Sequence, residues 1–533
     1  MVIKVINYIN FFFYNVKYIL FNKKLFNNNN DNKKNKILVE LYTYLPSIIS
    51  FSILSNLLAK RYNAKIYSYT VGQRSKLGII LHYLLNFFIF KIYISFGANK
   101  HIYPNSKNYS DKIYNSVVKK VKSEKDLLKL KIKNIFIGDL FYDEYLRRFS
   151  VGYIDINNKN FIHFLKEAVT NFLFWDSRLD QSVKSLIISH SVYLTGLPGR
   201  IAVHKKIPVY NIALNSVYYL NTKHYTKFSG FEDYPLIFKK IKKKLKKNIL
   251  KEARKKILNK FLGKFDITQI GSTIKHIDAN NIFRNNPNLK KIKIDKNKNN
   301  ILIASHCFSD AVHSHGIGIF SNFHEWIQFL VKYSKKKKNY MWYVKMHPAE
   351  FDRNKKILDN LLSGYDNFII LPKNTSHNQI VSAKIDVVLT VYGTVGYEYP
   401  FLDVPVINAS FNGPHQAYSF NFHSKTKREY LNLLDNIPTI KKNIINRKQK
   451  LQICEYYFLK FMSQYHFINN LDNIMIRLKQ NYNTPIIFKE YIDQFNKKDF
   501  KVKEKELSKF ILSKKNRIYA DNSSKKSRVV LFH

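Results

Sequence analysis

The stretch from Met341 to Ser410 decides the fold; it begins MWYVKMHP and ends DVVLTVYGTVGYEYPFLDVPVINAS. Its apolar runs predict three buried strands, each followed by a polar or glycine-rich turn: Met341–Met346, Asp386–Val391 and Val404–Ala409. In an open parallel sheet, ligands bind beyond the carboxyl ends of the strands. Because His347-Pro348 and Gly393–Glu398 fall at those ends, we expect the chemistry there.

The same alternation of strand and helix extends outward over most of the chain. Residues 37–40, 46–62 and 64–69 predict a strand, a helix and a strand, and further strands are expected near 134–137, 186–190 and 209–212. A second series of strands is expected near residues 301, 341, 367, 386 and 404. We therefore predict an α/β fold: two Rossmann-like doubly wound domains facing across a cleft, with extra helices.

Composition shifts set the expected boundaries. We predict an apolar and Asn/Lys-rich segment, a first Rossmann-like domain, a basic helical segment with a linker, a second Rossmann-like domain, C-terminal helices and a frayed basic tail. Their ranges are 1–36, 37–222, 223–300, 301–440, 441–512 and 513–533.

Charge and cysteine content limit the classes of function. The net charge of +52 favours anionic partners, although an excess of Lys and Asn throughout the chain also points to compositional drift. Lys far outnumbers Arg and no nucleic-acid motif is present, so nucleic acid is an unlikely partner. The two cysteines, Cys307 and Cys454, cannot form a disulfide framework, so we expect a cytoplasmic protein.

Three segments bear on a membrane. The N-terminus, VIKVINYINFFFYNVKYILF, lacks a signal-peptide cleavage site and a clean spanning run, so it either lies on a membrane surface or packs on the protein. Residues 77–96 predict a buried helix followed by a strand. The Lys-rich helix at 238–260 is either a solvated helix or a contact with the inner membrane face.

The strand ends of the second domain offer groups for a nucleotide. Pro348 fixes how the His347 side chain leaves the sheet, and an imidazole there can donate to a phosphate; the alternative is a simple turn. Gly393, Thr394 and Gly396 open a short helix whose backbone amides favour phosphate. Glu398, one turn on, can accept hydrogen bonds from a ribose diol; the alternative is a glycine-bounded turn with a surface carboxylate.

Two polar clusters follow strands of the first domain. One holds Asp139 and Asp143, and the other holds His190, Tyr193 and, a little further on, Arg200. Each Asp is either a helix cap or a substrate-facing carboxylate, and His190 is either a core histidine or an acceptor-side group.

The loop Ser305–Gly316 is rich in histidine. We expect it to line the cleft, with Asp310 as a general-base candidate and His313 binding phosphate or acceptor. The alternative is a metal site made by His306, His313, His315 and Asp310, but no companion motif supports it and we expect no metal.

These residues give the chain a resemblance to GT-B glycosyltransferases of bacterial surface-polysaccharide assembly. The nearest in pattern are the capsule-synthesis Kdo and sialic-acid transferases and, more distantly, the CDP-glycerol polymerases of teichoic-acid synthesis. VKMHP and LTVYGTVGYEYPFLDVPVINAS carry the resemblance, with HCFSDAVHSHG and IGDLFYDEYLRR. It implies a GT-B-like fold in which 37–222 is the acceptor-side domain and 301–440 the nucleotide-sugar domain. It also implies that His347 and Pro348 contact the donor phosphate, that Gly393 and Thr394 hold the nucleotide, and that Glu398 contacts ribose. The polymerases favour paired serines where this chain has Gly393-Thr394.

We therefore expect a glycosyltransferase that needs no cofactor or metal, with a nucleotide-sugar as donor and a growing glycan or lipid-linked acceptor. His347 and either Asp310 or Asp139 would act in catalysis, and Asp143, His190, Tyr193 and Arg200 would face the acceptor. The alternatives are a polyol-phosphate transferase or sugar-nucleotide epimerase of the same fold, and a non-catalytic basic protein that binds nucleic acid or membrane.

Overall fold

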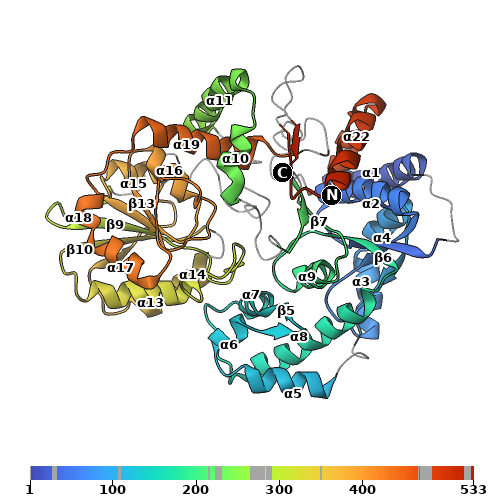
Figure 1. Ribbon diagram of the computed structural model, residues 1–533, viewed down its shortest axis with the longest axis horizontal. Coiled ribbons are helices and arrows are strands. Elements are labelled where there is room, and N and C mark those ends of the chain that lie inside the picture. Colours follow the sequence, from blue (N-terminus) through green and yellow to red (C-terminus); the bar gives the residue numbers. More distant parts are fainter. Residues whose placement is uncertain are drawn as a thin grey trace. The chain divides into compact units, whose positions relative to one another are not determined.

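The computed structural model (Figure 1) describes most of the chain. The described residues are 2–26, 33–105, 110–213, 216–222, 231–264, 283, 291–348, 351–465, 467, 483–520 and 530–532. They divide into two compact units: unit 1 comprises 1–141, 156–228 and 464–533, and unit 2 comprises 142–155 and 229–463.

Unit 1 contains a sheet of six described strands, in the spatial order β3-β2-β1-β6-β7-β8. The strands are β1 (Asn35–Glu40), β2 (Ala64–Tyr69), β3 (Ala98–Ile102), β6 (Val183–Ile188), β7 (Val209–Ala213) and β8 (Ser216–Leu220). All neighbouring strands pair in parallel except β7 and β8, which pair antiparallel. The first two strands are joined by α2 (Leu45–Tyr62), which is buried over most of its length because its apolar residues face in all directions.

Unit 2 repeats this order with six described strands, β11-β10-β9-β12-β13-β14, all parallel. They are β9 (Asn299–Ala304), β10 (Tyr340–Lys345), β11 (Phe368–Ile370), β12 (Val387–Thr390), β13 (Val406–Asn408) and β14 (Phe422–His423). When the strands of each six-stranded sheet are numbered along the chain, their spatial order is 3-2-1-4-5-6. This is the doubly wound order. Each unit is therefore Rossmann-like, which confirms the predicted fold class; the cleft between the domains stays a prediction.

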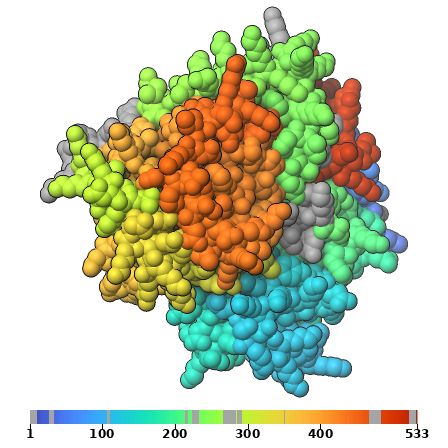
Figure 2. Space-filling model, turned by 60° about the vertical axis from the view of Figure 1, so that its left-hand side comes forward, coloured from blue at the N-terminus to red at the C-terminus, as the bar shows by residue number. Residues whose placement is uncertain are grey.

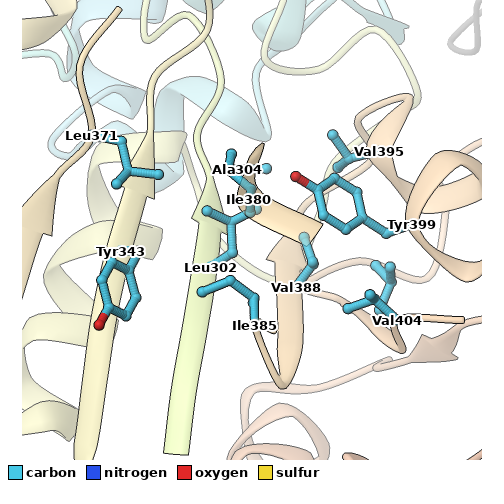
Figure 3. Close-up of a cluster of buried hydrophobic side chains, with 11 residues drawn as sticks. Leu302, Ala304, Tyr343, Leu371, Ile380, Ile385, Val388, Val395, Tyr399 and Val404 are labelled. Atoms are coloured by element: carbon cyan, nitrogen blue, oxygen red, sulfur yellow. The ribbon is translucent and has the colours of Figure 1, made fainter. Parts of the chain in front are cut away.

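The core of unit 2 explains why its strands read as continuous apolar runs. On one face of the sheet, Leu302, Val388 and Val406 pack under α15 (His377–Ser382) and α16 (Val395–Phe401), which contribute Ile380 and Tyr399 (Figure 3). The opposite face carries Trp342, whose ring meets that of Tyr333 on α13 (Phe323–Ser334) with centroids 6.2 Å apart. Helices cover both faces in Figure 1, as a parallel sheet requires.

Several boundaries differ from those expected. α1 (Val2–Leu25) belongs to unit 1, where Tyr18 stacks on Phe488 of α21 (Ile486–Asp493), so segment 1–36 is no separate part. The basic helix α11 (Lys243–Phe261) belongs to unit 2 and lies against α19 (Arg447–Tyr457), as the green and orange segments of Figure 2 show. The expected C-terminal helices are divided, because α21 and α22 (Lys497–Ser513) return to unit 1.

Four smaller predictions are also corrected. The strand expected near 134–137 is a two-residue hairpin partner, β5 (Ile135–Phe136) with β4 (Lys131–Ile132), outside the main sheet. The tail expected to fray contains β15 (Ile518–Ala520), which is buried and pairs with β16 (Val530–Phe532). Residues 77–96 form two helices, α3 (Lys76–Leu85) and α4 (Phe87–Ser95), and α3 has no buried residue. The linker expected at the end of the segment 223–300 already contains the start of β9, and much of 265–290 lies outside the described residues.

Candidate functional site

The site in unit 2 lies where β9 and β12 are neighbours. The chain leaves β9 towards β10 on one side and leaves β12 towards β13 on the other, so the loops after these two strands diverge. A crevice at such a switch point is where doubly wound sheets bind ligands. The loop after β9 brings Ser305 and His306, and the loop after β12 brings Tyr392 and Gly393.

His306 holds the two loops together. Its Nε2 lies 3.1 Å from Thr390 Oγ1 and accepts the backbone N–H of Val391 at 3.2 Å, while Gly393 N donates to Thr390 Oγ1 at 3.2 Å. An Nε2 that accepts an N–H must be unprotonated. The pKa of His306 is lowered to about 3, first by burial and then by His347 and His315 nearby. His306 is therefore neutral near pH 7 and braces the turn before Thr394, a role that the sequence did not indicate.

A small hollow opens beside this brace. It is lined by Val312 and Gly316 of the loop after β9, by Phe323 at the start of α13, and by Tyr392 and Asn412 after β12 and β13. The Tyr392 hydroxyl donates to the Val312 carbonyl at 2.8 Å, which ties the wall to the histidine-rich loop. The loop thus lines a pocket at the switch point, within unit 2.

His347 and Pro348 follow β10 at the same edge of the sheet. His347 is exposed, and it is close enough to His306 to lower the pKa of that imidazole. Before it, Lys345 ends the strand, and burial lowers the pKa of its amine to about 8. His315 and His347 therefore both act on the neutral His306 at this edge of the sheet.

The segment Gly393–Glu398 forms the predicted turn and short helix. Gly396 is fixed by packing, because a Cβ there would lie 2.5 Å from the buried ring of His415. Thr394 is exposed at the helix start, and its hydroxyl hydrogen-bonds to Glu398. The helix that follows, α16, has only seven residues.

Glu398 is not placed as a ligand of a ribose in this structure. Its carboxylate is 2% exposed and accepts a hydrogen bond from Lys260 Nζ of α11 at 2.6 Å, and Lys260 also donates to Tyr397 Oη at 2.6 Å. Burial alone would raise the pKa of Glu398, but Lys260, His377 and Thr394 outweigh it and hold that pKa below its usual range. Neither reading from the sequence anticipated an internal ion pair, because Lys260 lies far away along the chain.

His313 and Asp143 form a second internal pair, which corrects both of their predicted roles. Asp143 Oδ1 lies 2.6 Å from His313 Nδ1 and its Oδ2 accepts the His313 backbone N–H at 3.0 Å, while His313 Nε2 faces the Ser321 carbonyl at 3.0 Å. Both side chains are buried, at 3% and 1% exposure. His313 is therefore turned inward from any phosphate, and Asp143 belongs to unit 2 although it was expected on the acceptor side. Asp310 is exposed and acts on the pKa of Tyr392, so it stays a general-base candidate.

Asp139 and Arg200 form an internal pair in unit 1. Both Arg200 Nη atoms reach the Asp139 carboxylate, one of them at 2.9 Å, and the two side chains are 1% and 4% exposed. This bidentate pair ties α7 (Gly138–Phe149) to α9 (Leu197–His204). It leaves Asp139 unsuited to catalysis and Arg200 unsuited to acceptor binding. Tyr193 is also buried, with its backbone at a φ of 57°.

The switch point of unit 1 lies between β1 and β6 and carries a residue that the sequence analysis missed. Glu40 ends β1 and accepts hydrogen bonds from Ser189 N at 2.6 Å and Ser189 Oγ at 2.9 Å; that hydroxyl lies 2.8 Å from His190 Nδ1. Burial raises the pKa of Glu40 to about 7, although the hydrogen bonds from Ser189 lower it. His190, half-buried beside the ring of Tyr42, is thus the outer member of a chain that ends on a titratable carboxyl. The sequence did contain a signal for this site, because the acidic residue Glu40 directly follows the apolar run Ile37–Val39 at the end of the strand.

In the part of the chain that the structure describes, no group of three or more His, Cys, Asp or Glu side chains is placed to hold a metal ion.

Comparisons with known proteins give only remote similarity. No family model and no curated protein matches the chain. Among solved structures, it is similar to the UDP-GlcNAc 2-epimerase of Neisseria meningitidis bound to UDP-GlcNAc, with 12% identity and a TM-score of 0.25, over 79% of this chain and 97% of the other. It is also similar to a glycosyltransferase of Rickettsia africae, with 11% identity and a TM-score of 0.26, over 87% and 100% of the two chains. For the wall teichoic acid polymerase TagF the values are 12% and 0.21, over 92% and 99%.

TM-scores of this size do not assign the chain to any of these groups. The class follows from the two sheets themselves: this is an α/β protein with two Rossmann-like units, each with polar side chains at its switch point.

Proposed function

We propose that the protein is a glycosyltransferase. It moves a sugar from a nucleotide-activated donor to a hydroxyl of a growing surface polysaccharide or lipid-linked glycan, without a metal ion. The observation that supports this proposal is the switch point of unit 2, where exposed His347, the His306-braced turn and the hollow beside Tyr392 lie at one sheet edge. The resemblance of VKMHP and the GTVGYE segment to GT-B transferases supplies the reaction.

In the proposed reaction, the acceptor oxygen forms a bond to the anomeric carbon while the bond from that carbon to the phosphate oxygen breaks. The acceptor proton passes to a general base, and the nucleotide leaves with its new negative charge. His347 donates a hydrogen bond to the phosphate, and the turn at Gly393-Thr394 holds the nucleotide. Fixed donors of this kind stabilise the charge that develops in the transition state. Asp310 is the base candidate of unit 2, and the Glu40–Ser189–His190 chain is the candidate of unit 1.

The first test is ligand binding by the full chain. A ligand that binds only the folded state stabilises it, by about 2.7 kcal/mol at a hundred times its Kd. We expect one of the UDP-, CDP-, CMP- or GDP-sugars to raise the melting temperature of unit 2. A panel without any shift, together with steeply salt-dependent binding of nucleic acid, would instead support the non-catalytic alternative.

The second test is His347→Ala. We expect turnover of the donor identified by binding to fall by about a hundredfold or more, the usual effect of losing a fixed donor to a developing anion. The fold should be unchanged because His347 is exposed. His163→Ala, at an exposed histidine of α8 (Lys159–Arg178), is the matched control and should keep full activity. Full activity of the His347 variant would refute the site.

The products separate the related reactions. Isomerisation of the nucleotide-sugar without an acceptor would identify an epimerase, and transfer of a polyol phosphate would identify a polymerase of the CDP-glycerol type. Transfer of the sugar to an acceptor, with release of the nucleotide, is the expected result.

A further inference from the structure

α3 presents apolar side chains to the outside of unit 1. None of its ten residues is buried, and five leucine and isoleucine side chains are more than half exposed: Leu77 75%, Ile80 58%, Leu81 53%, Leu84 64% and Leu85 75%. A soluble protein seldom exposes such a contiguous apolar patch without a partner. The sequence predicted this segment as a buried helix, and the structure turns its apolar residues outward instead.

The patch continues over α4 onto α1, which lie next to one another in Figure 1. Ring contacts connect them: Phe12 to Phe88 with centroids 5.6 Å apart, Phe88 to Phe87 at 5.6 Å, and Phe87 to Tyr83 of α3 at 6.1 Å. Together these helices form one surface, the apolar face. It consists of the exposed side chains of Phe11, Phe12, Phe13, Leu77, Ile80, Leu81, Leu84, Leu85 and Phe87.

The apolar face is attached firmly to the sheet of unit 1. On the inner side of α4, Phe90, Ile92 and Tyr93 are buried, and the Tyr93 hydroxyl donates to the Glu40 carbonyl at 2.7 Å. No single helix among the described residues is long and apolar enough to cross a membrane; only α3 and α4 together reach that composition, and they are bent by 77°. Because α4 is held by its buried side, the pair offers a surface to lie against a bilayer.

The charges of the segment that carries α3 and α4 are of one sign. From Ala64 to Ser110 the sequence has no Asp or Glu. Arg74 and Lys76 stand at the start of α3, and Lys91 of α4 lies over the ring of Phe87 with its Nζ 5.3 Å from the centroid. Apolar side chains bordered by cations match the interface of a bilayer with anionic headgroups.

We infer that the apolar face docks unit 1 on an anionic lipid surface, with α3 inserted among the headgroups and Arg74, Lys76 and Lys91 facing lipid phosphates. A second copy of this chain fits less well, because a two-fold interface places the same surface against itself and would bring these cations together without any carboxylate from the segment. This inference does not depend on the proposed function.

The test is co-sedimentation of the full chain with vesicles of phosphatidylcholine, with and without phosphatidylglycerol. We expect binding to the anionic vesicles only, and a loss of affinity of about tenfold or more in Leu81→Gln/Leu84→Gln, because buried apolar area and charge both set such binding. The matched control is Leu258→Gln/Leu262→Gln, which alters two exposed leucines at the end of the basic helix α11. Loss of binding in the α11 variant but not in the α3 variant would overturn the inference.

A second measurement covers the case of a poorly folding variant. A fluorophore sensitive to polarity is attached at Leu84→Cys or at Leu262→Cys; the native Cys307 and Cys454 are buried. We expect a blue shift on anionic vesicles for the label on α3 only. Absence of that shift, or a dimer in solution that Leu81→Gln/Leu84→Gln dissociates, would show that lipid is not the occupant.

Discussion

At the scale of single residues, the main outcome is that charged side chains chosen as candidate site groups have internal partners. Asp139, Asp143 and Glu398 each pair with a buried Arg, His or Lys that lies between 61 and 170 residues away in the sequence. A carboxylate that is taken out of water needs such a partner. The sequence drew attention to these carboxylates through the expected strand ends before them, but it could not show the partners that hold them inside the protein.

The Lys260–Glu398 pair gives a prediction at this scale. Lys260→Met should destabilise unit 2 by about 3–5 kcal/mol, because it leaves a buried carboxylate without its counter-charge. Glu398→Gln should destabilise it too, and the double variant should cost less than the sum of the two. Urea unfolding of the four proteins measures this coupling.

The same cycle separates the two roles of Glu398. If Glu398 only pairs with Lys260, the double variant should regain nucleotide-sugar affinity as it regains stability. If stability returns and affinity does not, Glu398 also contacts the ligand, as the resemblance implies.

At the scale of elements, the sequence predicted most strands of the two main sheets, but not β8 or β14, and it missed the orientation of α3. β1, β10 and β12 are mainly apolar runs that end in a polar residue, and Ser305 directly follows β9, so both the position and the carboxyl ends of these strands could be predicted. α3 is equally apolar, yet hydropathy carries no information on whether a helix faces a core or the outside. The brace made by His306 was also hidden, since it joins the loops after β9 and β12, which become neighbours only through the strand order.

Gly396 provides a test at the scale of an element. An added Cβ would lie 2.5 Å from His415 Cε1 and Nδ1, and His415 is fully buried and has no room to move aside. We expect Gly396→Ala to displace α16 and to lower the free energy of unfolding by about 1–3 kcal/mol, as overpacked cores do. In Gly72→Ala, where nothing lies within 4 Å of the new methyl group, the change should stay within about 1 kcal/mol. Equal stability of the two variants would show that α16 tolerates a side chain at Gly396.

At the scale of the whole molecule, the chain is not two consecutive domains with a linker between them. Residues 142–155 belong to unit 2 although they lie within the first half, and residues 464–533 return to unit 1. Composition could not predict this, because the returning helices α21 and α22 resemble any other amphipathic helices. Long-range packing holds them in unit 1. Phe488 of α21 stacks on Tyr18 of α1 with ring centroids 4.1 Å apart, and Phe510 of α22 meets Tyr210 of β7 with centroids 6.3 Å apart.

Phe488 tests this assignment. It is fully buried, so Phe488→Ala should cost about 3–5 kcal/mol, the usual loss for a large buried ring. Since Phe488 packs in unit 1, amide hydrogen exchange should accelerate in β1 and α2, far away in sequence, while β9 in unit 2 keeps its protection. Ile486→Ala, on the same helix but 37% exposed, is the control and should cost about 1 kcal/mol or less. Faster exchange in β9 but not in β1 would mean that the C-terminal helices stabilise unit 2, and the division of the chain given above would then be wrong.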